Sequence, residues 1–186
     1  MASILFWVLG GVVLVLGIYS NYTNWKTYFA AKKAKEEFMK NHPDAEVTYA
    51  GKNRPWFYTL FAVICLCLAS FMVLAKNVEM DFNQRFSMSL VYFALAVYLA
   101  AMAVEAQTDS RICYTPDGFI FTDKYMRYKQ ITSVEVGGNF FKSSFIHFGG
   151  KEQISTPKYI AAWVQENWVE WRKNRDAKRK KGKHRS

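Results

Sequence analysis

Residues 55–75 read PWFYTLFAVICLCLASFMVLA, a nearly continuous run of apolar residues without a single charged side chain. About twenty apolar residues suffice to cross the ~30 Å hydrocarbon core of a bilayer, because a helix rises about 1.5 Å per residue and satisfies its own backbone hydrogen bonds. Residues 3–19 and 86–104 form two further runs of this kind, and neither contains a charge. The sequence therefore predicts three transmembrane helices.

The first of these runs has a competing interpretation as a secretory signal peptide. A signal peptide needs basic residues before its apolar core and small residues at a cleavage site after it. No basic residue precedes Ile4, and the sequence from Ile18 to Asn21, IYSN, is a poor cleavage motif. We therefore favour a retained membrane anchor.

The basic residues predict how the chain is oriented in the membrane. Between the first two runs lie seven of them: Lys26, Lys32, Lys33, Lys35, Lys40, Lys52 and Arg54. Only Lys76 and Arg85 lie between the second and third runs, and all the others follow the third. Because basic loops stay in the cytoplasm, we expect the N-terminus outside, residues 22–54 inside, residues 76–85 outside and the C-terminal region inside. The expected location is a membrane, with the C-terminal region on its cytoplasmic side.

The chain is strongly basic, with a formal net charge of +10, and it ends in RKNRDAKRKKGKHRS. Basic residues beside anionic headgroups gain about 1 kcal/mol each, which accounts for such a tail in a membrane protein. Membrane lipids are thus the expected partners, and nucleic acid is not. The tail from Arg172 onward is either a helix on the membrane or disordered, and disorder is the default expectation because at least half of its residues are Lys or Arg.

The first helix should extend beyond the membrane and end near Asn41, since Pro43 disfavours helical geometry in the residue before it. Residues 43–54 then form a short link. Aromatic residues are enriched where a membrane meets water, and Trp25, Phe29 and Trp56 are placed to lie there.

Gly10 and Gly17 lie seven residues apart and therefore on one face of the first helix. Small residues allow two helices to approach closely in a membrane. An ordinary packing face within the chain is the favoured interpretation, and a homo-oligomer is left open.

The pattern changes from Arg111 onward to short alternating segments separated by turn signals. The predicted strands are residues 111–115, 118–122, 125–128, 131–137, 140–148 and 151–155. A helix follows from Pro157, with apolar residues at helical spacing: Ile160, Val164, Trp168 and Trp171. We expect one antiparallel meander closed by one amphipathic helix, so that the whole chain is an α+β membrane protein.

The stretch ICYTPDGFIFTDKYMRYKQITSVEV, residues 112–136, and the helix after it resemble bacterial pleckstrin-homology-like domains that are attached to membrane hairpins. The shared features are a DG turn, an aromatic-rich strand, the element formed by Tyr128, Ile131 and Val134, a long hairpin and a capping helix. The resemblance extends over about residues 56–175 to small membrane proteins with three spans followed by such a domain. It implies a small pleckstrin-like sheet with fewer strands than the full seven, and a bacterial cytoplasmic membrane as the location of the protein.

These observations divide the chain into four parts. The expected parts are residues 1–54, a membrane helix with a cytoplasmic extension; 55–106, a membrane hairpin; 107–175, the pleckstrin-like domain; and 176–186, a basic tail.

Catalytic chemistry needs several groups that converge in one site. The three histidines, His42, His147 and His184, have no partner at metal-ligand spacing, and none of the familiar catalytic or phosphate-binding motifs occurs. Cys65, Cys67 and Cys113 are expected to be small apolar fillers with free thiols. We therefore expect no enzyme activity, no metal and no cofactor.

The leading hypothesis is a non-enzymatic membrane protein whose domain at residues 107–175 docks a protein partner or lipid headgroups. The candidate contacts are Lys124, Arg127, Lys129 and Lys142. The alternative is self-immunity against a membrane-active bacteriocin, a role that small basic membrane proteins play.

Overall fold

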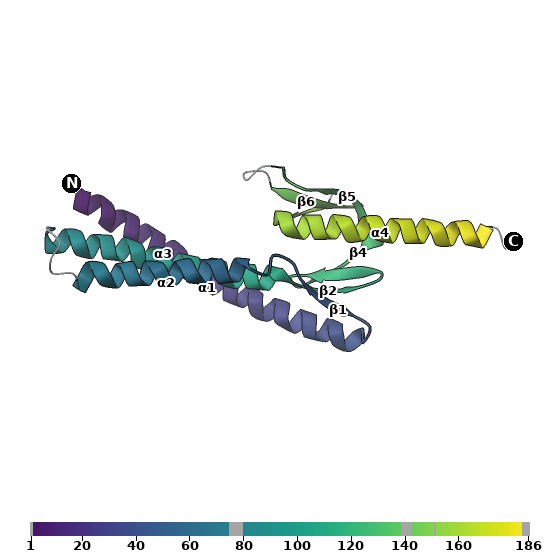
Figure 1. The fold of residues 1–186 in the computed structure, drawn as a ribbon, viewed down its shortest axis with the longest axis horizontal. Helices are drawn as coiled ribbons and strands as arrows, with labels where there is room; N and C mark the ends of the chain where they lie inside the picture. The colour runs from purple at the N-terminus through teal and green to yellow at the C-terminus, as the bar shows by residue number, and fades with distance from the viewer. Residues whose placement is uncertain (1, 75–79, 139–142, 151, 184–186) are drawn as a thin grey trace. The chain divides into compact units, whose positions relative to one another are not determined.

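The computed structural model describes residues 2–74, 80–138, 143–150 and 152–183 (Figure 1). The chain divides into two compact units. Unit 1 consists of residues 1–30 and 52–108, and unit 2 consists of residues 31–51 and 109–186. The first helix contributes to both units, so its extension and the link after it belong with the C-terminal sheet region.

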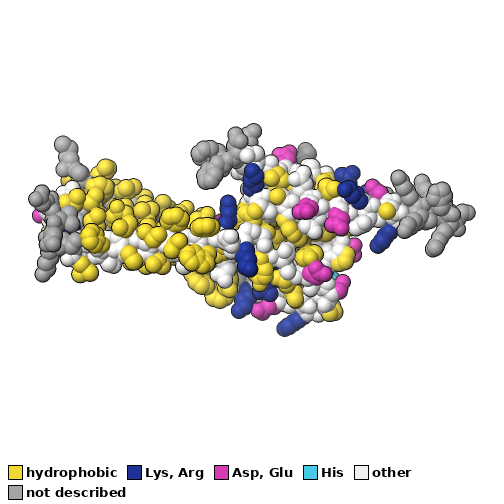
Figure 2. Space-filling view, in the orientation of Figure 1, with side chains coloured by type: hydrophobic (Ala, Val, Ile, Leu, Met, Phe, Trp, Pro, Cys, Tyr) yellow, Lys and Arg dark blue, Asp and Glu magenta, His cyan; other side chains and the backbone are white. Residues whose placement is uncertain are grey.

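Unit 1 is built from helices α1 (Ala2–Asn41), α2 (Arg54–Leu74) and α3 (Phe82–Ser110). Among the described residues, these are the three helices that are long and apolar enough to cross a membrane, as the sequence predicts. Most of their apolar side chains are exposed, including Ile4 at 68% and Leu74 at 75%. Figure 2 shows these side chains as a broad apolar surface over the helices of unit 1.

Polar side chains connect the helices of unit 1 through backbone carbonyl oxygens. The Asn21 amide donates to Val97 O at 2.7 Å, and the Asn24 amide donates to Ala101 O at 2.9 Å. On the other side of α3, the Ser89 hydroxyl donates to Ala69 O of α2 at 2.8 Å. Such bonds favour one register between the helices.

Unit 2 contains two antiparallel sheets. The first has the order β1-β2-β3-β4 and consists of β1 (Glu46–Tyr49), β2 (Arg111–Thr115), β3 (Gly118–Phe121) and β4 (Lys124–Arg127). The second has the order β5-β6-β7 and consists of β5 (Ile131–Glu135), β6 (Ser144–Phe148) and β7 (Gln153–Thr156). A 3-10 turn, η1 (Tyr128–Gln130), joins β4 to β5. The prediction of antiparallel strands over this region is confirmed.

The sheet region differs from the sequence prediction in two respects. Residues 43–54 are not merely a link, because β1 within them pairs with β2, with Val47 opposite Cys113. The strands also form two sheets instead of one meander. With β1 included, the described residues contain seven strands, more than the six expected. The pairing partner of β1 lies more than sixty residues later in the chain, and a four-residue segment gives little periodicity of its own.

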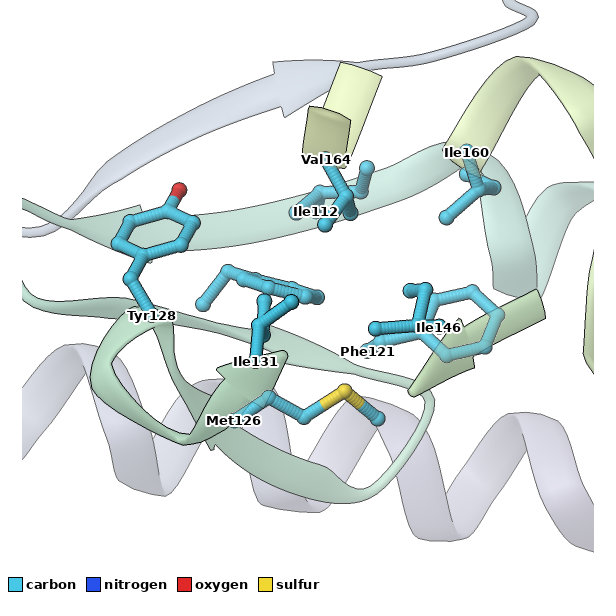
Figure 3. Packing of buried hydrophobic residues seen from close by; sticks show 9 residues of the cluster. Ile112, Phe121, Met126, Tyr128, Ile131, Ile146, Ile160 and Val164 are labelled. Carbon is cyan, nitrogen blue, oxygen red and sulfur yellow. The ribbon is translucent and has the colours of Figure 1, made fainter. Parts of the chain in front are cut away.

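The main core of unit 2 lies between the two sheets and helix α4 (Lys158–Lys183). Figure 3 shows Ile112 and Phe121 of the first sheet, Ile146 of the second, and Ile160 and Val164 of α4 pointing toward one another. The helical spacing of the α4 residues places them on one face, as predicted. Pro157 precedes this helix, and its carbonyl oxygen accepts hydrogen bonds from the amides of the first turn.

The opposite face of the first sheet is covered by the end of α1. Phe38 of α1 packs there with Cys113 of β2 and Ile120 of β3. Because side chains alternate along a strand, Ile120 faces α1 while its neighbours in β3 face the main core. Two helical segments therefore cover this sheet, where the sequence predicts one.

Helix α4 continues to Lys183, so the expectation of disorder from Arg172 onward is wrong for the described part of the tail. The helix is supported beyond the core by Arg172 over the Trp168 ring at 4.9 Å and Arg175 over the Trp171 ring at 5.1 Å. Cation–π contacts one turn apart stabilise a helix whose other side chains are largely charged.

Candidate functional site

Three of the four predicted basic contacts lie on or next to β4. Lys124 and Arg127 begin and end this strand, Lys129 lies in η1, and all three are exposed. The fourth, Lys142, lies outside the described residues. Because a strand alternates its side chains, Lys124 and Arg127 project to opposite faces of β4. They therefore flank the strand instead of forming one flat patch.

Strand β4 is an edge of the four-stranded sheet, with β3 as its neighbour in the described chain. One row of backbone donors and acceptors on an edge strand is open for pairing with another extended segment. Next to this edge is a groove of about 320 Å³, lined by Lys124 and Met126 of β4 and by Phe148, Glu152 and Ile154 from the second sheet and its turn. The edge therefore adjoins an apolar and polar groove that can accept side chains of a bound strand.

The position of β4 is held from its other face by three rings. Phe38 of α1 lies 5.2 Å from the Tyr125 ring and 4.7 Å from the His42 ring, centroid to centroid. Tyr125 lies between the two basic residues of β4, and its hydroxyl would lie 2.9 Å from a Cβ added at Gly118. The edge strand is thus anchored to α1 by aromatic packing.

A cluster of charged groups that the sequence did not reveal lies under the end of α1. Lys35 is only 3% exposed, although it belongs to a run of otherwise exposed Lys and Glu residues. It follows Ala31 by four residues and precedes Phe38 by three, so it lies on the α1 face that covers the sheet. Asp109, Arg111 and Cys113 provide its electrostatic environment.

Burial shifts the pKa values of this cluster. Removal from water lowers the pKa of Lys35 from 10.5 to about 8, against the opposing influence of Cys113 and Asp109. Burial likewise raises the pKa of the Cys113 thiol above 9.0, although Arg111 and Lys35 oppose this change. Lys35 lies well beyond the uncharged part of α1, in unit 2. A buried Lys with a lowered pKa can mark a functional site. The simpler interpretation of Lys35 is structural: it helps to hold α1 against the first sheet.

The shifted pKa of Lys35 predicts that unit 2 becomes more stable between about pH 8 and 9. Below pH 8 both the folded and unfolded states carry the Lys35 proton, so the cost of burying the charge is fully present. Above pH 8 the folded state releases this proton first, the unfolded state binds more protons, and the free energy of unfolding rises by about 1 kcal/mol per pH unit. Above pH 9 the raised pKa of Cys113 acts in the opposite direction.

Urea unfolding of the detergent-solubilised protein at pH 7, 8 and 9 measures this effect, with amide exchange in β2 and β3 as the readout for unit 2. The Lys35→Met variant should lack the rise between pH 8 and 9. A flat or falling curve for the wild type in this interval, or an equal rise in the variant, would contradict the assignment.

The residues predicted at the membrane boundary are exposed. Trp25 and Phe29 are stacked on α1 with ring centroids 5.7 Å apart, and Tyr28 packs edge-on against both. Trp56 lies in the first turn of α2 and is 65% exposed. The Trp and Tyr rings have the amphipathic character that suits a headgroup region, and Phe29 adds apolar contact beside them.

Gly10 and Gly17 both lie against α3. A Cβ at Gly10 would lie 3.0 Å from Leu90 Cγ, and a Cβ at Gly17 would lie 3.2 Å from the backbone nitrogen of Tyr98. The two glycines therefore lie where α1 and α3 approach each other within unit 1.

No group of three or more His, Cys, Asp or Glu residues suited to a metal ion occurs in the part of the chain that the structure describes. Comparison of the chain with protein-family models, with curated proteins and with solved structures finds no match.

Proposed function

We propose that this protein is a non-enzymatic, multi-pass membrane protein that presents unit 2 on the cytoplasmic side to dock a protein partner at the β4 edge. Lipid headgroups are the other ligand class that the basic residues suit. The observation that supports membrane insertion is the exposure of apolar side chains around α1, α2 and α3. Only 11%, 11% and 28% of the most apolar 18-residue stretch of these helices, in that order, is buried.

Exposed apolar surface of this extent is rare on soluble monomers and costs free energy in water. A bilayer removes the cost, since lipid chains are as apolar as the side chains themselves. The distribution of basic residues then favours a cytoplasmic location for the α1 extension and the C-terminal region. Trp25, Phe29 and Trp56 would lie at headgroup level in this arrangement.

The architecture of unit 2 supports its assignment as a pleckstrin-like domain. The full pleckstrin-homology version has seven strands and a capping helix, and the described residues of unit 2 contain seven strands followed by α4. The strand that raises the number to seven is β1, which comes from before the membrane hairpin. In this proposal the domain is assembled from two segments of the chain.

Three features of β4 support docking of a protein segment there. The strand is an edge, it adjoins the 320 Å³ groove, and exposed cations flank it. Addition of a strand supplies backbone hydrogen bonds, while the groove and the flanking charges select side chains. The preferred segment is extended and acidic, because Lys124, Arg127 and Lys129 outnumber Asp123 and Glu152 around the edge.

The docking proposal predicts that neutralising the flanking cations weakens partner capture. The triple variant Lys124→Gln, Arg127→Gln, Lys129→Gln should recover about tenfold less of any stoichiometric partner in affinity purification from native membranes, assuming roughly 0.5 kcal/mol per lost charge. Quantitative mass spectrometry of crosslinked material measures the recovery.

The matched control carries the same change in charge at exposed positions away from β4: Lys32→Gln, Lys40→Gln, Lys173→Gln. It should retain wild-type recovery. If both triple variants lose the partner equally, or neither does, docking at the β4 edge is wrong.

A further inference from the structure

Unit 2 has a second cavity, of about 400 Å³, between the turn that joins β2 to β3 and the face of α4 beyond the main core. Its lining includes Asp117 and Tyr128 from the sheet side and Glu170, Trp171, Arg175 and Lys178 from α4. The α4 residues lie on one face of the helix, because Trp171, Arg175 and Lys178 follow one another at intervals of four and three residues and Glu170 is next to Trp171. None of the residues lining this cavity lines the groove beside β4.

Tyr128 is the feature of this cavity that points to a ligand. The side chain is only 3% exposed, and its hydroxyl has no hydrogen-bond partner among the described residues. In Figure 3 the hydroxyl is at the end of the ring that points away from Ile131 and Met126. Burial raises its pKa well above the ordinary value of 10.0, so the hydroxyl remains a donor. Buried polar atoms are nearly always paired, so this donor calls for an acceptor.

The charges around the cavity restrict the chemical class of the ligand that supplies this acceptor. Asp117 and Glu170 provide two carboxylates, while Arg175 and Lys178 provide two cations. A simple anion would meet the carboxylates, and a simple cation would meet the guanidinium and the ammonium group. A ligand with both a positive and a negative end finds a partner for each.

The cationic side of the cavity suits a phosphate group. Arg175 is held by its position over the Trp171 ring, and it also contacts the exposed Asp176 at 3.0 Å. An exposed ion pair between neighbouring residues is weak and can be exchanged for a phosphate contact. The Arg175 guanidinium, the Lys178 ammonium group and the Tyr128 hydroxyl together offer more hydrogen-bond donors than the two oxygens of a carboxylate can accept from. A phosphate group has more oxygen atoms to accept these bonds.

We propose that this cavity binds a phosphoethanolamine group. The phosphate accepts hydrogen bonds from Tyr128, Arg175 and Lys178, and the ammonium group lies next to Asp117 and Glu170. The group can belong to a lipid headgroup or to a soluble phosphomonoester, and both share this chemistry. The proposal goes beyond docking at β4 and does not depend on it.

Isothermal titration of the purified full-length protein in non-ionic detergent tests the proposal. The probes are phosphoethanolamine, glycerophosphoethanolamine, inorganic phosphate and ethanolamine. At least one of the two phosphoethanolamine compounds should bind at least about tenfold more tightly than phosphate or ethanolamine alone. Preference for the glycerol diester indicates a lipid headgroup, and preference for the monoester indicates a soluble ligand. Equal binding of inorganic phosphate alone, or no binding of either compound, would overturn the proposal.

The Tyr128→Phe variant separates ligand binding from folding. Its affinity should fall about tenfold or more, because a hydrogen bond to a charged group is lost. Its stability without ligand should stay the same or increase, since the hydroxyl that is removed has no partner in the described protein. Tyr125→Phe, on β4, is the matched control and should bind like the wild type.

A second variant, Lys178→Gln, removes an exposed cation that lines the cavity from α4 and lies outside the main core. It should weaken phosphoethanolamine binding several-fold and lower the salt dependence of binding. Wild-type affinity in both Tyr128→Phe and Lys178→Gln would show that the ligand does not occupy this cavity.

Discussion

Replacement of Phe119 by alanine is expected to destabilise unit 2 by about 3–5 kcal/mol, the typical cost of emptying a large aromatic site in a core. Phe119 is fully buried, and its ring lies 5.6 Å from Tyr128 and 5.8 Å from Trp163, centroid to centroid. It therefore connects β3, η1 and α4, and its loss leaves a cavity where these three elements meet.

Amide hydrogen exchange measured peptide by peptide in detergent resolves this effect within unit 2. Exchange should accelerate in β2, β3 and α4 of Phe119→Ala, while α2 remains unchanged. Val169→Ala on the exposed side of α4 is the matched control and should cost less than about 1 kcal/mol. If the two variants exchange alike, the assignment of the main core is wrong.

Replacement of Gly17 by leucine should separate α1 from α3 in unit 1. The new Cβ alone would lie 3.2 Å from both the Tyr98 backbone nitrogen and Val97 Cγ1. A larger side chain then forces the helices apart and breaks the nearby bond from Asn21 to Val97 O. We expect a loss of about 1–3 kcal/mol or more, as for other overpacked sites.

Gly11 provides a control in the same helix, because nothing lies within 4 Å of a Cβ built there. Thermal midpoints of the detergent-solubilised protein, followed by size-exclusion chromatography, should fall for Gly17→Leu and stay near wild type for Gly11→Leu. A fall for Gly11→Leu with no effect of Gly17→Leu would mean that the outer face of α1, and not the face toward α3, is the packing surface.

The elements that the sequence predicts well are those whose signal is local. Residues 55–75 need no partner to be recognised as an apolar helix, and α2 covers nearly the same residues. The strands from Arg111 onward alternate between turn signals such as Pro116, Asp117 and Gly118, and the predicted bounds of the first three agree with β2, β3 and β4 to within one residue. The next two predicted strands are longer than the observed ones: 131–137 ends at Glu135, and the described part of 140–148 forms a strand only from Ser144.

Elements that depend on distant partners are the ones that were missed. β1 acquires its strand character from pairing with β2, which the sequence cannot indicate from four residues. Lys35 is hidden for the same reason, because its neighbours Lys33 and Glu36 give it the appearance of a solvated charge. Its position on the same helix face as Ala31 and Phe38 was an available signal, since three residues at helical spacing shared one buried side.

The basic residues near β4 were predicted from charge alone, and the sequence could not place them around an edge. Which strand lies at an edge depends on the order of strands in the sheet, and this order includes β1. The second cavity was not predicted either. It combines Asp117 and Tyr128 with one face of α4, and the part of that face that carries Arg175 and Lys178 lies beyond Arg172, where disorder was the default expectation.

The most direct test of membrane insertion uses the native thiols. Cys67 of α2 is exposed in the structure, so it would react readily with a water-soluble maleimide if α2 lay in water. In native membranes we predict that Cys67 resists a charged maleimide and is labelled only after the protein is unfolded in SDS, because maleimides react with thiols that water can reach. A cysteine introduced at Lys173 should react with the charged reagent once the membrane is opened. Rapid labelling of Cys67 by the charged reagent in intact membranes would contradict the account.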